Sequence, residues 1–228
     1  MPNYCNNNIR ITGDSSTISA IHTVMMGAGY ARADDDDSDL GQPMNLVPMP
    51  TLLWGTRSPA PTGVLTAEDL PPELAGEATE RIQEHADAVE RAERAKRQTG
   101  FADWYTWSVA NWGTKWSMKV SEYLKYDNEI LISGVTAWSP PLELYSNISR
   151  LYPVTIHAEY AEEGMDFIGA GIYRDSEQLA LSEGSISDNM PDDFDWDDDD
   201  AWEIAGDVKE ELFAQHVEIA RTKAGFCV

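Results

Sequence analysis

The residues of this 228-residue chain whose types and spacing most clearly suggest a binding function form a run of aspartates with two aromatic side chains among them. The run comprises Asp192, Asp193, Phe194, Asp195, Trp196, Asp197, Asp198, Asp199 and Asp200. Duplex DNA carries one negative charge per about 1.7 Å of its axis, so a row of carboxylates can occupy a basic groove built for phosphates. Buried aromatic residues can anchor such a charge-driven contact. The pattern predicts a partner-binding surface, and the alternative is a solvated acidic loop.

A second candidate site lies in the segment 101–118, which holds four of the eight tryptophans. Trp104, Trp112, Lys115 and Trp116 could surround a small ligand or nucleotide, because indole rings stack on bases and a lysine can reach a phosphate. The alternative is that these aromatic residues fill the core and that Gly113 provides a tight turn. The sequence leaves both interpretations open.

Patterns typical of catalysis, metal binding or cofactor binding are absent from the sequence. An EF-hand loop that began at Asp195 would need glycine and glutamate where Asp200 and Gly206 stand. The four histidines are dispersed, and neither a glycine-rich phosphate loop nor a nucleophile elbow occurs. The two cysteines, Cys5 and Cys227, lie at opposite ends of the chain, so Cys5 is predicted to be a buried thiol. We therefore expect no enzyme, no catalytic residue, no metal and no cofactor.

The charge of the chain excludes several classes of partner. Forty acidic and 16 basic residues give a formal net charge of −24, and residues 157–228 hold 20 of the acids and only 4 of the bases. Such a chain should be repelled by nucleic acid and by anionic membranes. The sequence has no apolar run of about 18 residues and no signal-peptide pattern, which favours the host cytoplasm.

Hydrophobic periodicity and capping signals predict the strands and helices that hold these residues. Strands are expected at about 8–12, 129–138, 153–159 and 166–174, with an edge strand or extended segment at 44–50. Helices are expected after Asp14, over 73–98, from Pro140 to about Leu151, and from about 202 to 223, with a helix preferred over a strand for 101–112. This order predicts an α+β fold, a ferredoxin-like split β-α-β sandwich with a helical insertion and an acidic C-terminal extension.

Three pieces of the sequence resemble one family, the YubB-type ferredoxin-like domain proteins of phages and conjugative plasmids. They are the opening Met-Pro-Asn-Tyr-Cys-Asn-Asn, the segment from Asn45 to Pro50, and Asn-Trp-Gly-Thr-Lys-Trp at 111–116 with Trp-Tyr-Thr-Trp at 104–107 upstream. The resemblance covers roughly residues 1–175 and leaves out the aspartate-rich segment and the last helix. It implies a ferredoxin-like fold without an iron–sulfur cluster and an origin in a mobile element, and it carries over no catalytic residue.

These observations together predict a ferredoxin-like domain over residues 1–175, with an insertion at about 54–100. An acidic segment and a C-terminal helix at 176–228 are expected to pack on the same domain. The preferred function is that of a phage or plasmid accessory protein which binds and inhibits a host defence or nucleic-acid-handling protein with a basic groove. The alternatives are a ligand-binding module at the tryptophan-rich segment and a structural or assembly protein. The oligomeric state stays open.

Overall fold

The computed structural model describes residues 3–27, 40–191, 194 and 201–226. The chain divides into two compact units, which are described separately below. The first combines Met1–Val47 with Asn111–Val228, and the second is Pro48–Ala110.

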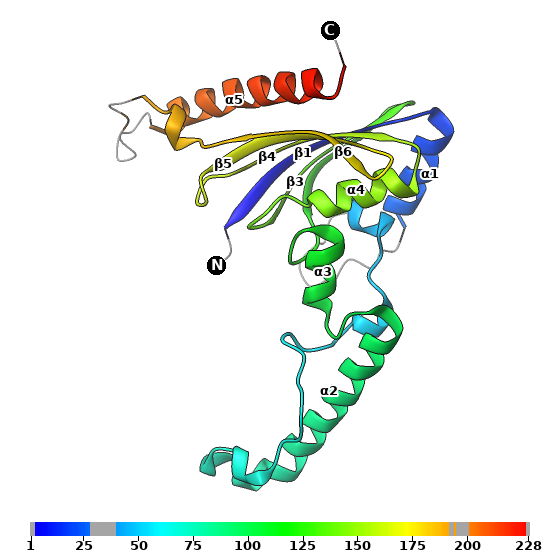
Figure 1. Ribbon diagram of the computed structural model, residues 1–228, viewed down its shortest axis with the longest axis vertical. Coiled ribbons are helices and arrows are strands. Elements are labelled where there is room, and N and C mark those ends of the chain that lie inside the picture. Colours follow the sequence, from blue (N-terminus) through cyan, green and yellow to red (C-terminus); the bar gives the residue numbers. More distant parts are fainter. Residues whose placement is uncertain (1–2, 28–39, 192–193, 195–200, 227–228) are drawn as a thin grey trace. The chain divides into compact units, whose positions relative to one another are not determined.

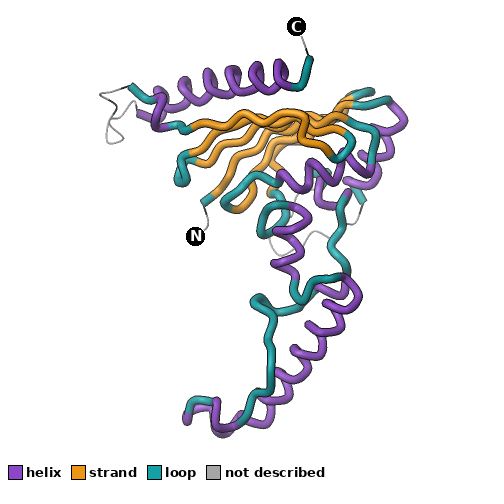
Figure 2. The backbone as a smooth tube through the Cα atoms, in the orientation of Figure 1, coloured by secondary structure: helices purple, strands orange, loops and turns teal. Residues whose placement is uncertain are grey.

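The first unit is built on a six-stranded antiparallel sheet in the order β2-β3-β1-β4-β5-β6. Its strands are drawn in orange in Figure 2. Its strands are β1 (Tyr4–Thr12), β2 (Lys119–Lys125), β3 (Glu129–Ala137), β4 (Thr155–Glu162), β5 (Phe167–Arg174) and β6 (Glu177–Gly184). Its helices are α1 (Ser15–Met25), α4 (Leu142–Leu151) and α5 (Ala201–Lys223). The elements β1-α1-β2-β3-α4-β4 place β3 between β1 and β2, which is the split β-α-β arrangement of a ferredoxin-like domain. The predicted α+β, ferredoxin-like fold is therefore confirmed, and β5 and β6 extend the sheet beyond β4.

Local sequence explains why the first elements form where they do. In β1, Cys5, Asn7, Ile9 and Ile11 are buried while the residues between them are exposed, as a period of two requires. The side chain of Asp14 then accepts hydrogen bonds from the backbone nitrogens of Ser16 and Thr17, which caps α1 as predicted.

Helices cover both faces of the sheet (Figure 1). On one face, α1 and α4 bury Ile18, Ile21, Leu144, Tyr145 and Ile148 against the sheet. On the other face, α5 packs on β5 and β6 through two apolar clusters. Their buried members are Ala161, Ile168, Ile186 and Leu212 in the first cluster, and Ala170, Ile172, Ala180 and Ala220 in the second. Cys5 is fully buried, which confirms the prediction of a buried thiol.

The second unit is helical. It contains the 3-10 turns Thr51–Leu53, Ala67–Asp69 and Pro72–Glu77, the helix α2 (Ala78–Thr99) and most of α3 (Trp104–Trp112). Helix α2 has an alanine-rich apolar side, and it buries Ala92 and Ala95. Arg91 fixes the neighbouring loop by donating from Nη1 to the carbonyl oxygen of Gly55, at 3.2 Å. The unit spans more of the chain than the predicted insertion at 54–100.

The structure differs from the sequence-based expectations in three places. The segment 44–50, expected as an edge strand or an extended segment, starts within a buried 3-10 turn (Pro43–Leu46), because Pro43 begins the turn and the side chain of Gln42 caps it. Residues 47–50 belong to no helix or strand. The strands β2 and β6 were not predicted, since they are the two edges of the sheet and β2 buries only one of its seven residues. The boundary expected at residue 175 falls in the hairpin between β5 and β6, so β6 belongs to the sheet.

Candidate functional site

The predicted partner-binding run, 192–200, lies outside the described residues except for Phe194. Phe194 is half-buried, and its backbone nitrogen donates to the carbonyl oxygen of Pro191 at 3.0 Å. The binding role of the run therefore stays a prediction, and the adjoining helix α5 provides the described part of the acidic region.

One side of α5 carries a row of exposed carboxylates. The row consists of Glu203, Asp207, Glu210, Glu211 and Glu218. At 100° per residue these positions fall within about 100° of the helix circumference, opposite the side that buries Leu212 and His216 on the sheet. With a rise of 1.5 Å per residue, the row spans about 22 Å. The helix thus presents one acidic face to solvent and one apolar face to β5 and β6.

Two of the three basic side chains of α5 contact other elements and do not neutralise this row. Lys209 forms an ion pair with Glu163, in the turn between β4 and β5. The ammonium group of Lys223 donates to the carbonyl oxygen of Leu181 in β6, at 2.9 Å. Across the described part of the chain, none of the five carboxylates has a basic group within 4 Å. From Glu203 to Glu218 the outer face of α5 is therefore a source of negative potential, and Arg221, three residues after Glu218 on the same side, adds one positive charge near the end of the helix.

The second candidate site is a cluster of one lysine and two tryptophans in the first unit. The Nζ atom of Lys115 lies 4.8 Å from the ring centroid of Trp116 and 5.0 Å from that of Trp138. The two indole rings are 6.0 Å apart and tilted by 36°. Such a cation between ring faces is held by the ring quadrupoles. The cluster exposes flat aromatic surface, because Trp138 is 42% exposed.

The backbone around this cluster is unusual. Trp138 has a φ of 63°, in the left-handed region that bulky residues rarely adopt. Its backbone nitrogen donates to the carbonyl oxygen of Asn3 at 3.0 Å, which holds it in place at the end of β3. Two further hydrogen bonds join residues 113–114 to the end of β3 and the residues that follow it. Oγ1 of Thr114 donates to the carbonyl of Ala137, and Oγ of Ser139 donates to the carbonyl of Gly113. Strained backbone of this kind is common at functional sites, where the surroundings hold it.

The structure brings together only part of the predicted ligand site. Lys115 and Trp116 are neighbours, but Trp112 is a core residue whose Nε1 donates to the carbonyl oxygen of Val47 at 2.8 Å. Trp104 belongs to the second unit, where its backbone nitrogen donates to Oγ1 of Thr56. Sequence reasoning missed Trp138, because it lies on a different segment and only the hydrogen bonds of the folded chain place it beside Trp116.

A serine–histidine pair also requires an explanation. Oγ of Ser182 in β6 lies 2.7 Å from Nδ1 of His216 in α5. Both residues are buried, at 7% exposure each, so this pair fixes α5 on the sheet and is closed to a substrate. Across the described residues, no group of three His, Cys, Asp or Glu side chains is placed to hold a metal ion.

Comparisons with known proteins address the fold. No curated protein sequence matches this chain. A crystal structure of protein api92 from Yersinia pseudotuberculosis is 13% identical, with a TM-score of 0.43, and the alignment covers 81% of this chain and 99% of that one. Within the described ranges, no helix has the length and apolarity needed to cross a membrane.

A family model described as the ferredoxin-like domain in Api92-like protein matches residues 111–204. The match begins at the Asn-Trp-Gly-Thr-Lys-Trp string and includes the aspartate-rich segment. The matched range thus extends past residue 175, where the resemblance noted in the sequence ends. Over residues 111–204 the chain is similar to the ferredoxin-like domain of Api92-like proteins.

Proposed function

We propose that this protein binds and inhibits a host defence or nucleic-acid-handling protein whose binding groove is basic. The observation that carries the proposal is the row of unpaired carboxylates on α5. A rigid helix that displays negative charge over about 22 Å offers a basic groove the charge pattern that phosphates normally supply. The neighbouring run 192–200 adds seven aspartates, together with Phe194 and Trp196 as aromatic anchors.

The proposal includes a biological setting, that of a phage or plasmid accessory protein in the host cytoplasm. Its support is the resemblance of the opening residues, the Asn45–Pro50 segment and the Asn-Trp-Gly-Thr-Lys-Trp string to YubB-type proteins. The partner is a protein, because a chain with a net charge of −24 is repelled by nucleic acid itself.

Matched charge variants test the acidic face. The triple variant D207N, E211Q and E218Q removes three charges from α5. The control variant E73Q, E80Q and E90Q removes three charges from exposed, unpaired positions of the second unit. The wild-type protein and both variants are immobilised and used to capture binders from host lysate at low and high salt, and the captured binders are then challenged with excess duplex DNA.

We expect the wild type and the control variant to capture the same proteins at low salt, and duplex DNA to release them. High salt and the α5 variant should both reduce capture, because ions screen charges beyond a Debye length of about 8 to 10 Å. Capture that resists high salt, DNA and the α5 substitutions would contradict charge mimicry. The same experiment on a chain without residues 192–200 separates the role of that run from the role of α5.

The cluster of Lys115, Trp116 and Trp138 supports a second candidate function, the binding of a small aromatic anion such as a nucleotide. The exposed indole of Trp138 and the half-buried indole of Trp116, beside a cation, could stack on a base and attract its phosphate. A nucleotide panel should quench tryptophan fluorescence in the wild type and in W54F, whose tryptophan is exposed in the second unit. Quenching should be lost in W138F, and an equal response in all three proteins would eliminate this function.

A further inference from the structure

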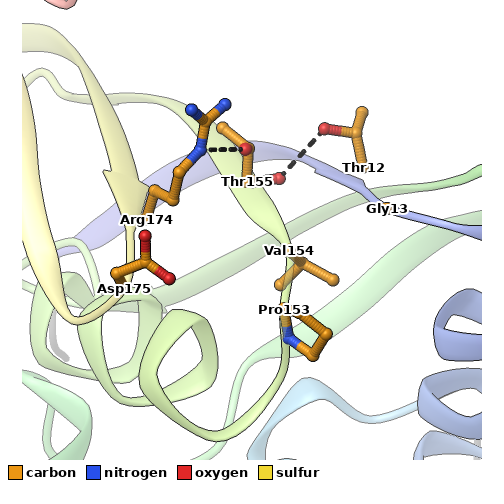
Figure 3. A pocket seen from close by; sticks show the side chains of 7 residues that line it. All are labelled: Thr12, Gly13, Pro153, Val154, Thr155, Arg174 and Asp175. Carbon is orange, nitrogen blue, oxygen red and sulfur yellow. Dashed lines mark hydrogen bonds between the residues drawn. The ribbon is translucent and has the colours of Figure 1, made fainter.

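Three neighbouring strands align a row of polar side chains on the face of the sheet that α5 partly covers. Thr12 of β1 pairs with Thr155 of β4, and the next position of the β4–β5 ladder places Thr155 beside Arg174. These three residues line an open pocket of about 370 Å³, together with Gly13, Pro153, Val154 and Asp175 (Figure 3). The pocket lies at the end of the sheet, apart from the acidic row and from the tryptophan cluster.

Arg174 is held in a fixed orientation in this pocket. Its Nε donates to Oγ1 of Thr155 at 2.8 Å, and its guanidinium group lies 5.0 Å from the ring centroid of Phe226. Thr155 is itself fixed, because its carbonyl oxygen accepts a hydrogen bond from the hydroxyl of Thr12. Among the described residues, no carboxylate lies within 4 Å of Arg174, so its two terminal nitrogens are available as donors. In a chain with 40 acidic residues, an arginine fixed without an ion pair requires an explanation.

Other basic groups gather around Arg174. In the next row on this face of the sheet, Arg10 of β1 lies opposite His157 of β4 in the strand register. Arg221 of α5 acts electrostatically on the same histidine. Burial, with Arg221, Arg10 and Arg174 as further causes, lowers the pKa of His157. Two carboxylates oppose these charges, since Glu129 lies 3.7 Å from Arg10 and Glu159 is within electrostatic range of it. Three arginines therefore act on this region of a strongly acidic protein.

Asp175 limits what the pocket can hold. Its carboxylate lines the pocket but makes no ion pair with Arg174, and the guanidinium group points away from it toward Thr155 (Figure 3). An anion would therefore bind at the guanidinium end, and Asp175 would weaken its binding by repulsion.

We propose that this pocket binds the phosphate group of a small phosphorylated ligand, with the terminal nitrogens of Arg174 as the principal donors. A planar guanidinium group matches two phosphate oxygens, and charge-assisted hydrogen bonds of this kind are stronger than neutral ones. Arg10 and Arg221 contribute longer-range attraction. This site is independent of the function proposed above.

Titration of the intact protein with inorganic phosphate, at constant ionic strength, tests the proposal. The ring signals of the histidines in NMR spectra report binding, because a bound phosphate dianion offsets the positive potential at His157 and raises its pKa. His85, in the second unit, provides an internal reference that should not change. Titration with a nucleoside monophosphate then shows whether the organic part of a ligand adds affinity.

Four substitutions give the expected pattern. R174Q should weaken phosphate binding roughly tenfold or more, since it removes a charge-assisted pair of hydrogen bonds. R221Q should weaken it less, because Arg221 acts only at longer range. D175N should strengthen it, and asparagine suits the φ of 55° at this position. The control R150Q removes the same charge from α4, where Arg150 donates only to Asn147, and should have no effect.

Three results would overturn the proposal. If phosphate fails to shift His157 in the wild type, the proposal is overturned. It is also overturned if R174Q binds phosphate like R150Q, or if D175N does not increase affinity. D175N and R221Q keep the proposal testable should R174Q fail to fold, because both positions are on the surface.

Discussion

Two buried tyrosines of the first unit offer a matched pair of substitutions with opposite expected effects. Tyr145 of α4 is 0% exposed, Tyr173 of β5 is 1% exposed, and their ring centroids are 5.6 Å apart. The hydroxyl of Tyr145 donates to Oδ1 of Asn7 at 3.2 Å. The hydroxyl of Tyr173 has no hydrogen-bond partner within the described part of the chain.

The magnitudes follow from these contacts. A buried polar group without a partner costs about 1–3 kcal/mol, so Tyr173→Phe should raise the free energy of unfolding by about 1 kcal/mol after the small void left by the oxygen is counted. Tyr145→Phe should lower it by about 1–2 kcal/mol, because Oδ1 of Asn7 loses its partner. Asn7 cannot turn to find another, since its Nδ2 donates to the carbonyl of Cys5 and to Oγ1 of Thr136.

Urea unfolding followed by circular dichroism measures both effects. Tyr126→Phe is the control, because Tyr126 is 49% exposed and surface substitutions usually change stability by less than about 0.5 kcal/mol. A loss of stability in Tyr173→Phe equal to that in Tyr145→Phe would refute the reasoning, since it would mean that the Tyr173 hydroxyl contributes a favourable interaction.

Three further predictions concern pH, thiol reactivity and backbone strain. Because the pKa of His157 is lowered below 6.5 in the folded protein, protonation favours unfolding, so stability should fall as the pH drops below 6.5. His157→Gln should reduce this fall, as measured by urea unfolding at several pH values. Burial raises the pKa of Cys5 to about 12, so its thiol should react with a thiol reagent only when urea unfolds the protein. If Cys5 reacted in the folded protein as fast as an exposed cysteine does, its buried position would be contradicted. Gly113 has a φ of 81°, and an added Cβ would clash with the carboxylate of Glu143, so Gly113→Ala should lower stability by about 1 kcal/mol or more, seen as a lower melting temperature.

Much of the fold was predictable from local patterns. The alternation in β1, the Asp14 cap of α1 and the two prolines before α4 each act within a few residues, and each predicts its element, although β1 begins at Tyr4, four residues before the expected start. The edge strands β2 and β6 were missed because an edge strand needs no apolar alternation, and its partner strand supplies the hydrogen bonds. The 3-10 turn at Pro43–Leu46 replaces the start of the expected edge strand or extended segment, because proline-bounded apolar residues suit a buried turn as well as a strand.

The candidate sites were less accessible to sequence reasoning. The tryptophan-rich segment divides between core and surface, since Trp112 is buried whereas Trp116 meets Trp138 from the end of β3. The pocket at Arg174 gave no sequence signal, because its lining residues come from separate strands with no shared motif.

The amino-acid sequence alone shows that the chain is acidic, that its acidic residues concentrate in residues 157–228, and that most elements follow the ferredoxin-like order, because composition and local periodicity need no tertiary contact. Only the tertiary structure decided which carboxylates form a row on α5, which tryptophan stands beside Lys115, and which arginine lies fixed without an ion pair. The physical reason is that helix docking and strand register set these distances, and both depend on residues that are far apart along the chain.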